Sequence, residues 1–453
     1  MSVATNKPAI GYGEILRLAW PASVAASVTP LLGAVDVWAL AQSSRPLDIA
    51  AIGLGSVIFS LAYWTFGFIR MSVAGLTAQA AGAEDEAEAR AALVRGGVIG
   101  ACIGVALVVL QLPIGLAAFQ LLGTGSEASA ETLAHGRTYF DIRIWGAPFA
   151  LASYAAFGWL TARGRTDFLM AASLFMTLLN IGLDYWFVMG LGWGAAGVAY
   201  GTLIAEIAGF FAAMAFVLVL LKDHGGVKMH WRPQEFWKAE RLGRTVAINF
   251  DIFIRTMLLA FCFAWFVQRS GAFGDVTLAA NQALLQLFLF TGLALDGTAI
   301  AAETLVGRAI GARDRATGKA RYVQAVRKTF LLGCLAAVLF TLFYWAAGTP
   351  LIALLTPEGP IREDMNAYMP WVIISPLIVV IGFQLDGIFI GATRSREMRD
   401  SMIVSAPIFL AASVWLANNW GNHGLWAAFS LYFILRAVTL AIWLPRIARS
   451  FDS

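Results

Sequence analysis

Residues 193–221 read WGAAGVAYGTLIAEIAGFFAAMAFVLVLL, a run in which Glu206 is the only charged side chain. A helix needs about 20 mostly apolar residues to cross the hydrocarbon core of a bilayer, so this run predicts a membrane-spanning helix. The rest of the chain is similar, with 59% hydrophobic and 13% charged residues, whereas soluble domains carry about 25% charged residues. We therefore expect an all-α integral membrane protein with twelve spans, at residues 14–42, 47–82, 91–121, 138–162, 166–191, 193–221, 245–270, 276–307, 322–348, 367–393, 400–418 and 421–445.

The Lys and Arg residues alternate with these spans. If the N-terminus faces the cytoplasm, 23 of the 32 basic residues lie in inner segments and 4 in outer ones. Inner loops of membrane proteins carry an excess of Lys and Arg, and an odd number of spans would scramble this pattern. We therefore expect a multi-pass protein of the inner (plasma) membrane with both termini in the cytoplasm.

The chain also repeats itself at an offset of 227–229 residues. Three groups of positions recur: Ala50, Phe59, Leu76, Gly82 and Asp85 as Ala279, Phe288, Leu305, Gly311 and Asp314; Gly158 and Arg165 as Gly387 and Arg394; Trp193 and Gly197 as Trp420 and Gly424. Six crossings return the chain to the same side, so the repeats predict two parallel six-helix lobes. We place these lobes at 1–221 and 245–453, joined by a cytoplasmic linker at 222–244.

Two parallel halves around a central path are typical of transporters that work by alternating access. A channel is the main rival, but no filter motif such as T-V-G-Y-G occurs. The three Cys and four His residues are scattered without metal-ligand or disulfide spacing, and no nucleophile–base pair stands out. We therefore expect no enzymatic activity and no cofactor. The net charge of +4 does not indicate a nucleic-acid partner.

Ionisable groups within the spans are candidates for function because they are costly in a bilayer. In the first half these groups are Asp36, Arg70, Asp141, Arg143, Asp184 and Glu206. Asp36, Asp184 and Thr202 lie roughly 9–13 Å from the outer ends of their helices, and Asn180 is one turn from Asp184. Such oxygen ligands suit Na⁺, and two neighbouring carboxylates also suit a proton. The alternative is that each group is separately hydrogen-bonded within the bundle.

The second half contains no copy of this cluster, which favours a single cation site in the first half. Asp251 and Arg255 are four residues apart on one helix, so we expect a structural ion pair between them. Three further acidic residues either line a substrate path for organic cations or pair with Arg255 or Arg436. They are Asp296, Glu303 and Asp386.

Seven short segments carry a resemblance to a known family. They are Pro30-Leu-Leu-Gly-Ala-Val-Asp36, Phe66-Gly-Phe-Ile-Arg-Met71, Gly75-Leu-Thr-Ala-Gln79, Asn180-Ile-Gly-Leu-Asp184, Gly190-Leu-Gly-Trp-Gly194, Ala301-Ala-Glu-Thr-Leu-Val-Gly307 and Asp386-Gly-Ile-Phe-Ile-Gly-Ala-Thr393. They look like the DinF branch of the MATE (multidrug and toxic compound extrusion) transporters. The resemblance implies two six-helix lobes in a V shape and drug export driven by entry of H⁺ or Na⁺.

By position, the resemblance implies roles for six residues of the first half. Asp36, Asn180, Asp184 and Thr202 match the coupling site, and are metal ligands if the ion is Na⁺. Tyr139 matches a tyrosine near that site, and Pro21 matches a proline at which the first helix bends. We accordingly expect a monomeric antiporter that exports amphiphilic, often cationic organic compounds across the lipid bilayer. The alternative on the same fold is a flippase or exporter of a lipid or lipid-linked metabolite.

Overall fold

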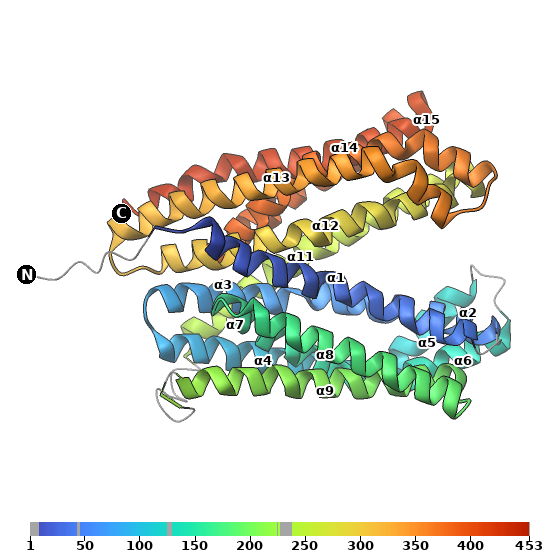
Figure 1. Ribbon diagram of the computed structural model, residues 1–453, viewed down its shortest axis with the longest axis horizontal. Helices are drawn as coiled ribbons and strands as arrows, with labels where there is room; N and C mark the ends of the chain where they lie inside the picture. Colours follow the sequence, from blue (N-terminus) through green and yellow to red (C-terminus); the bar gives the residue numbers. More distant parts are fainter. Residues whose placement is uncertain (1–8, 43–45, 125–128, 224, 227–237, 453) are drawn as a thin grey trace, which may run out of the picture. The chain divides into compact units, whose positions relative to one another are not determined.

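The computed structural model describes residues 9–42, 46–124, 129–223, 225–226 and 238–452, without the side chains of 29–42, 46–48 and 122–124. Those described residues are almost wholly helical (Figure 1). The helices are α1 (Tyr12–Gln42), α2 (Pro46–Phe66), α3 (Phe68–Gly82), α4 (Glu86–Val109), α5 (Gln111–Thr124), α6 (Ala130–Arg143), η1 (Ile144–Gly146), α7 (Ala147–Ala162), α8 (Thr166–Asp184), η2 (Tyr185–Gly190), α9 (Gly194–Asp223), α11 (Ala239–Ser270), η3 (Gly271–Phe273), α12 (Asp275–Ile310), α13 (Arg315–Leu355), α14 (Pro360–Gly391) and α15 (Ser395–Arg449).

These helices correspond to the twelve expected spans, although helix boundaries and spans do not coincide. Three spans consist of two helices each, namely α2–α3, α4–α5 and α6–α7. Conversely, α15 contains two spans, because the backbone leaves the helical conformation at Trp420 and Gly421. Gly421 has φ 59°, a left-handed value that a residue without a Cβ adopts readily. Within the described residues, nine helical stretches are long and apolar enough to cross a membrane, and α1, α6–α7 and the second part of α15 complete the twelve.

Large apolar side chains cover much of the outer surface. Leu121, Trp345 and Leu354 are 76%, 73% and 82% exposed. Side chains of this kind are costly in water but not in contact with lipid tails. Their exposure therefore fits a chain whose helices are surrounded by a bilayer.

The internal repeat is visible in the helix packing. Gly158 of α7 lies so close to the carbonyl oxygen of Arg70 that a Cβ would overlap it, and Gly387 of α14 lies in the same way against the carbonyl of Ala299. Both members of one contact are 229 residues from their counterparts in the other. The turns that follow are also equivalent, because Gly164 and Thr393, again 229 apart, both have positive φ. The two halves therefore share backbone geometry as well as sequence.

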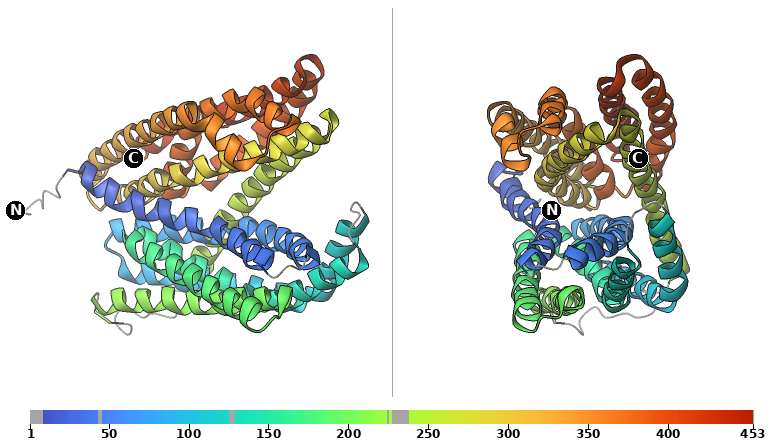
Figure 2. Two further views of the ribbon diagram at one scale, coloured as in Figure 1. Left: turned by 45° about the vertical axis from the view of Figure 1, so that its right-hand side comes forward. Right: turned by 90° about the vertical axis from the view of Figure 1, so that its right-hand side faces the viewer.

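The helices pack into two compact units. The C-terminal unit consists of Val246–Ser453 with Met1–Ser23 and Ala78–Glu84, and the N-terminal unit consists of Val24–Thr77 and Asp85–Thr245. Within each unit the helices run side by side (Figure 2). Unlike the sequence-based lobes, these units divide α1 and α3, so the start of α1 is grouped with the later helices. The lobe boundaries themselves stay a prediction.

Each unit has its own aromatic core. Phe266, Phe288, Trp426, Phe429 and Phe433 pack together in the C-terminal unit. In the N-terminal unit, Phe59, Tyr139, Phe140 and Ile144 form a cluster. Polar side chains next to these two cores are thus held in surroundings of low polarity.

Candidate functional site

The first site lies between α8 and α9, which approach closely because α9 presents glycines to α8. An added Cβ at Gly197 would lie 3.1 Å from Phe187, and one at Gly209 would lie 3.0 Å from Met176. At Gly201, between these two positions, a Cβ would overlap Oδ1 of Asp184. Small residues spaced four apart allow this approach between membrane helices. Gly201 therefore makes the space that the Asp184 carboxylate occupies.

Three of the four residues expected to bind a cation lie together on α8 and α9. Asn180 Nδ2 donates a hydrogen bond to Thr202 Oγ1 at 3.2 Å, and Thr202 follows Gly201, which contacts Asp184. Asp184 and Asn180 are 0% exposed and Thr202 is 3% exposed. Asp36 belongs to α1, but its side chain lies outside the described residues, so its distance from Asp184 stays a prediction.

Two acceptor oxygens on α8 remain available for a ligand. Asn180 Oδ1 and Thr177 Oγ1 are buried and have no hydrogen-bond partner among the described residues. Because Thr177, Asn180 and Asp184 follow a helical spacing of three and four residues, they lie on one face of α8. Buried acceptors without a donor are costly, and a bound cation would remove that cost. Thr177 was not among the residues predicted from the sequence. The available signal was its position three residues before Asn180, on the same helical face as the polar cluster.

A π-helix follows directly after Asp184. In η2 the N–H of Leu191 donates to the carbonyl of Trp186 five residues earlier, at 3.0 Å. The ring of Phe187 stacks on those of Trp186 and Trp193, with a centroid distance of 5.2 Å to each. π-Helical turns are rare and occur frequently at functional sites. This one changes the helix immediately beyond the carboxylate, and no pattern in the sequence indicated it.

Tyr139 belongs to a second polar group in the N-terminal unit. Its hydroxyl accepts a hydrogen bond from Arg143 at 2.5 Å, and Arg143 forms an ion pair with Glu206 at 3.1 Å. Tyr63 donates from its hydroxyl to the other oxygen of Glu206 at 3.2 Å. In the sequence, Arg143 and Glu206 stand out only as charged residues within spans, because they are 63 positions apart and no local spacing indicates the pair.

The polar network of the C-terminal unit corrects the expected ion pair between Asp251 and Arg255. Asp251 instead pairs with Arg399 at 2.6 Å and accepts a hydrogen bond from Ser395 at 2.9 Å. Arg255 pairs with Asp386 at 2.5 Å. The spacing of four residues on α11 permitted the pair, but partners on α14 and α15 lie closer to each side chain.

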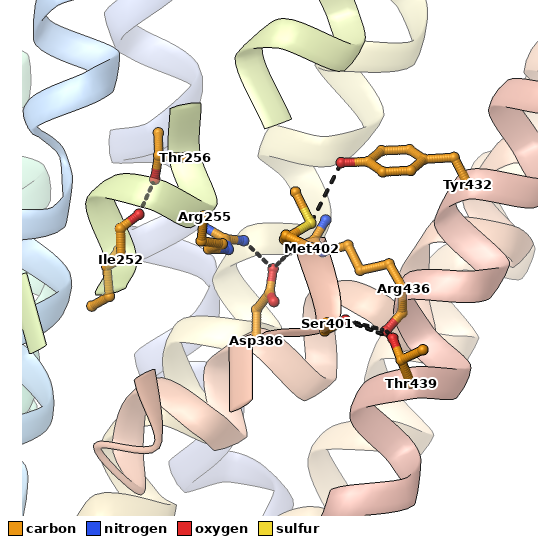
Figure 3. Close-up of polar contacts among 9 residues, drawn as sticks. All are labelled: Ile252, Arg255, Thr256, Asp386, Ser401, Met402, Tyr432, Arg436 and Thr439. Carbon is orange, nitrogen blue, oxygen red and sulfur yellow. Dashed lines mark hydrogen bonds and ion pairs between the residues drawn. The ribbon is translucent and has the colours of Figure 1, made fainter. Parts of the chain in front are cut away.

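Asp386 receives a second arginine, Arg436, on the same carboxylate oxygen (Figure 3). All three side chains are buried, with residue exposures of 5% for Arg255, 6% for Asp386 and 2% for Arg436. Two arginines share this one carboxylate, and the negative charge of Asp296 on α12 also acts on Arg436. Asp386 therefore acts as the anion that holds two arginines, which makes it a poor acceptor for an organic cation.

The other two acidic residues of the expected substrate path lie on α12. Glu303 is 1% exposed, whereas Asp296 is half-buried. The structure does not bring either into a hydrogen bond with Asp386. The substrate path was expected to include Asp296, Glu303 and Asp386. For Asp296 and Glu303 this role stays a prediction.

Pro21 lies in α1 next to its contact with α12. Ser23 donates a hydrogen bond to the carbonyl oxygen of Ala294 at 2.8 Å, and Gly297 of α12 lies against Ala19 and Ser23. The N-terminal unit begins at Val24. Pro21 thus precedes the point at which α1 passes from one unit into the other, and its role as a hinge stays a prediction.

Comparison with known proteins identifies the family. The MatE family model matches residues 21–186 and 252–415. The chain is 35% identical over 439 residues to the DNA damage-inducible protein F of Escherichia coli (strain K12), covering 94% of this chain and 91% of that protein. It is 24% identical over 453 residues to "Probable multidrug resistance protein NorM" of Neisseria meningitidis serogroup B, covering 95% and 92%.

The fold agrees with this assignment. A solved outward-facing structure of a multidrug resistance MATE family transporter of the MOP superfamily superposes with a TM-score of 0.85 at 18% sequence identity, covering 98% of this chain and 97% of that one. At this identity the likeness shows the fold alone, and the family follows from the model match and from the relative in Escherichia coli. The chain belongs to the MatE family, and the resemblance to MATE transporters is confirmed.

Proposed function

We propose that this protein is a secondary active antiporter that exports amphiphilic, often cationic organic compounds in exchange for H⁺ or Na⁺. The observation that carries the proposal is the buried group of Asn180, Asp184 and Thr202 between two membrane helices. An ionisable group at this depth is costly and is retained where it serves transport. The names of the relatives support export of drugs as the task, and nothing in this function calls for a chemical reaction or a cofactor.

The donor set fits either coupling ion. A Na⁺ ion would be held by Asn180 Oδ1, Thr202 Oγ1 and carboxylate oxygens of Asp184 and Asp36. A proton would instead neutralise one carboxylate, since burial and a neighbouring negative charge both favour the protonated acid. In both cases the positive charge changes the preferred packing of α1, which Pro21 allows to bend. A ligand shifts such an equilibrium only by binding the two forms with different affinity.

The same proposal places the protein in its membrane. It is a monomer in the inner (plasma) membrane, with both termini and residues 222–244 in the cytoplasm and with its two six-helix lobes moving against each other. The coupling site belongs to the first lobe. The paired state of Asp386 supports this location, because a carboxylate that holds two arginines cannot accept a proton or Na⁺ without releasing them.

Efflux from proteoliposomes under a pH gradient or a Na⁺ gradient, imposed separately, tests the proposal. We expect one gradient to drive export of a fluorescent organic cation such as ethidium. Asp184→Asn should reduce this export strongly, whereas Asp141→Asn, which removes a partly exposed pair with Arg137, should leave it near the wild-type rate. Absence of gradient-driven export for a broad panel of cations, together with transport of lipid or lipid-linked anions, would favour the flippase alternative.

A further inference from the structure

The side chain of Arg143 lies in a cage of aromatic rings. Its guanidinium carbon is 4.6 Å from the ring centroid of Phe59, 5.8 Å from that of Tyr63 and 5.7 Å from that of Tyr139. Glu206 closes the cage with its carboxylate, which pairs with Arg143. We call the side chains of Phe59, Tyr63, Tyr139 and Glu206 the aromatic–carboxylate cage. Aromatic rings around one anion form a typical recognition site for organic cations.

The backbone makes room for this carboxylate. An added Cβ at Gly146, in the short helix η1, would overlap Oε2 of Glu206. The break between α6 and α7 at η1 therefore places a residue without a side chain where Glu206 enters the cage. Arg143 is the last residue of α6, so both partners of the ion pair lie at this break.

The cage is located in the middle of its spans. Glu206 lies about 12 residues into α9, or roughly 18 Å along a helix that rises 1.5 Å per residue, and the hydrocarbon core is about 30 Å thick. Arg143 and Tyr63 both contact the Glu206 carboxylate, so their polar ends lie at the same depth. An ion pair at this depth has a high cost of desolvation, and structural stability alone is a weak reason to keep it.

The pair also remains within reach of a ligand. The side chains of Arg143 and Glu206 are 14% and 9% exposed, whereas Phe59 and Tyr139 are 2% and 0% exposed. The two charged side chains are thus more accessible than the rings of Phe59 and Tyr139. This arrangement differs from the group around Asp386, where both arginines are more deeply buried.

We propose that the aromatic–carboxylate cage is a binding site for organic monocations, and that Arg143 is the resident cation that such a ligand displaces. The inference rests on the proposed function and names the residues that recognise the cationic part of the exported compound. A tethered side chain competes at an effective concentration of order millimolar, so weakly bound cations fail to enter. An aromatic cation gains ring contacts that a hydrated inorganic ion lacks, and the cage therefore selects organic cations.

Binding by the purified full-length protein in nanodiscs tests this inference. Benzylguanidinium reproduces the guanidinium and adds a ring, and benzylurea is its neutral analogue of nearly the same shape. We expect Arg143→Met to raise the affinity for benzylguanidinium at least tenfold in equilibrium dialysis, because the competitor is gone, and to change that for benzylurea less than twofold. Introduced into Arg143→Met, where no competitor remains, Glu206→Gln should lower the affinity for the cation at least tenfold and leave that for benzylurea unchanged.

Arg137→Met is the matched control, because Arg137 lies on the same helix and forms a partly exposed ion pair with Asp141. It should change neither affinity by more than twofold. An unchanged or lower affinity of Arg143→Met for benzylguanidinium would overturn the inference. Equal gains for both ligands would also overturn it, since they would indicate only an enlarged cavity.

The variant Arg143→Met leaves Glu206 buried without its main partner, so folding can fail. The double variant Arg143→Met/Glu206→Gln removes both charges and avoids this cost. It should bind benzylguanidinium and benzylurea with affinities within twofold of each other, and a retained preference for the cation would refute the proposed site. Failure of the proposed function would give a different result. The wild type would then show no gradient-driven efflux, whereas the affinities of the variants for benzylguanidinium and benzylurea would still differ as described.

Discussion

Gly201→Ala should impair ion-coupled transport at the α8–α9 site while leaving the stability of the protein nearly unchanged. The new Cβ overlaps Asp184 Oδ1, and the carboxylate has to retreat by about 1 Å to reach an ordinary contact distance of 3.4 Å. Because the obstructing atom is the end of a side chain, rotation of Asp184 relieves the overlap. The remaining strain is offset by the higher helix propensity of Ala, about 1 kcal/mol relative to Gly. We therefore expect the free energy of unfolding to change by less than about 1 kcal/mol.

Transport should respond much more strongly than stability. A displacement of about 1 Å at a site that positions reacting or bound groups can cost about 100-fold in rate. Gradient-driven efflux from proteoliposomes should thus fall by about 10- to 100-fold. Thermal unfolding of the same samples measures stability.

Gly182→Ala provides the matched control, since Gly182 lies on α8 and a Cβ there meets nothing within 4 Å. This variant should transport at the wild-type rate. Wild-type efflux by Gly201→Ala would refute the assignment of Asp184 to coupling. The assignment would also be refuted if efflux fell only in proportion to the amount of folded protein.

Three further predictions follow from the other charged groups and from the topology. Asp386→Asn leaves two buried arginines without their anion and should lower the free energy of unfolding by about 3–5 kcal/mol. Asp141→Asn removes a partly exposed pair and should lower it by at most about 1 kcal/mol. Equal changes of the two variants in chemical unfolding would contradict the double ion pair at Asp386. Asp36→Asn should abolish gradient-driven export while the protein still inserts and folds, and full transport by this variant would refute the coupling mechanism. In intact cells, an impermeant thiol reagent should label a cysteine at Ser126 but not one at Asp223; the reverse pattern would exclude the proposed orientation.

The two carboxylate–arginine groups differ in the number of arginines that the carboxylate holds and in their expected roles. The pair of Arg143 and Glu206 is neutral, so a displaced arginine leaves a negative site for a cation. The carboxylate of Asp386 instead holds two arginines, and removing it leaves their positive charges facing one another. Electrostatics therefore favours binding at the first and mechanical stability at the second.

The N-terminal cap of α13 shows how the local sequence determines where a helix begins in water. Asp314 accepts hydrogen bonds from the backbone N–H of Ala316 and Thr317 at the start of the helix. The hydrogen bond from the Thr317 side chain lowers the pKa of Asp314, so this carboxylate stays ionised at neutral pH. Its counterpart in the repeat, Asp85, caps α4 by accepting from the N–H of Glu88 at 3.0 Å. The same residue type thus starts the equivalent helix in each half.

Most of the fold was predictable from the sequence, because a bilayer imposes a simple rule. Each crossing needs about 20 apolar residues, so the twelve spans and their ends are visible as hydropathy and charge. The repeat of 229 residues predicted equivalent positions, and Gly158 and Gly387 indeed make equivalent contacts. Asp184, Asn180 and Thr202 were identifiable because polar groups are expensive at that depth, and helical spacing placed two of them on one face.

Partners across helices were decided only by the tertiary structure. The spacing of Asp251 and Arg255 predicted a local ion pair, yet each finds its partner on another helix, because orientation and distance across helix interfaces are not visible in sequence spacing. Arg143 and Glu206, which are 63 positions apart in the sequence, form an ion pair next to η1. Gly201 leaves the space that the Asp184 carboxylate occupies. Hydropathy determines that a segment lies in the membrane. The rotation of each helix about its axis, which depends on packing against its neighbours, determines which charges meet.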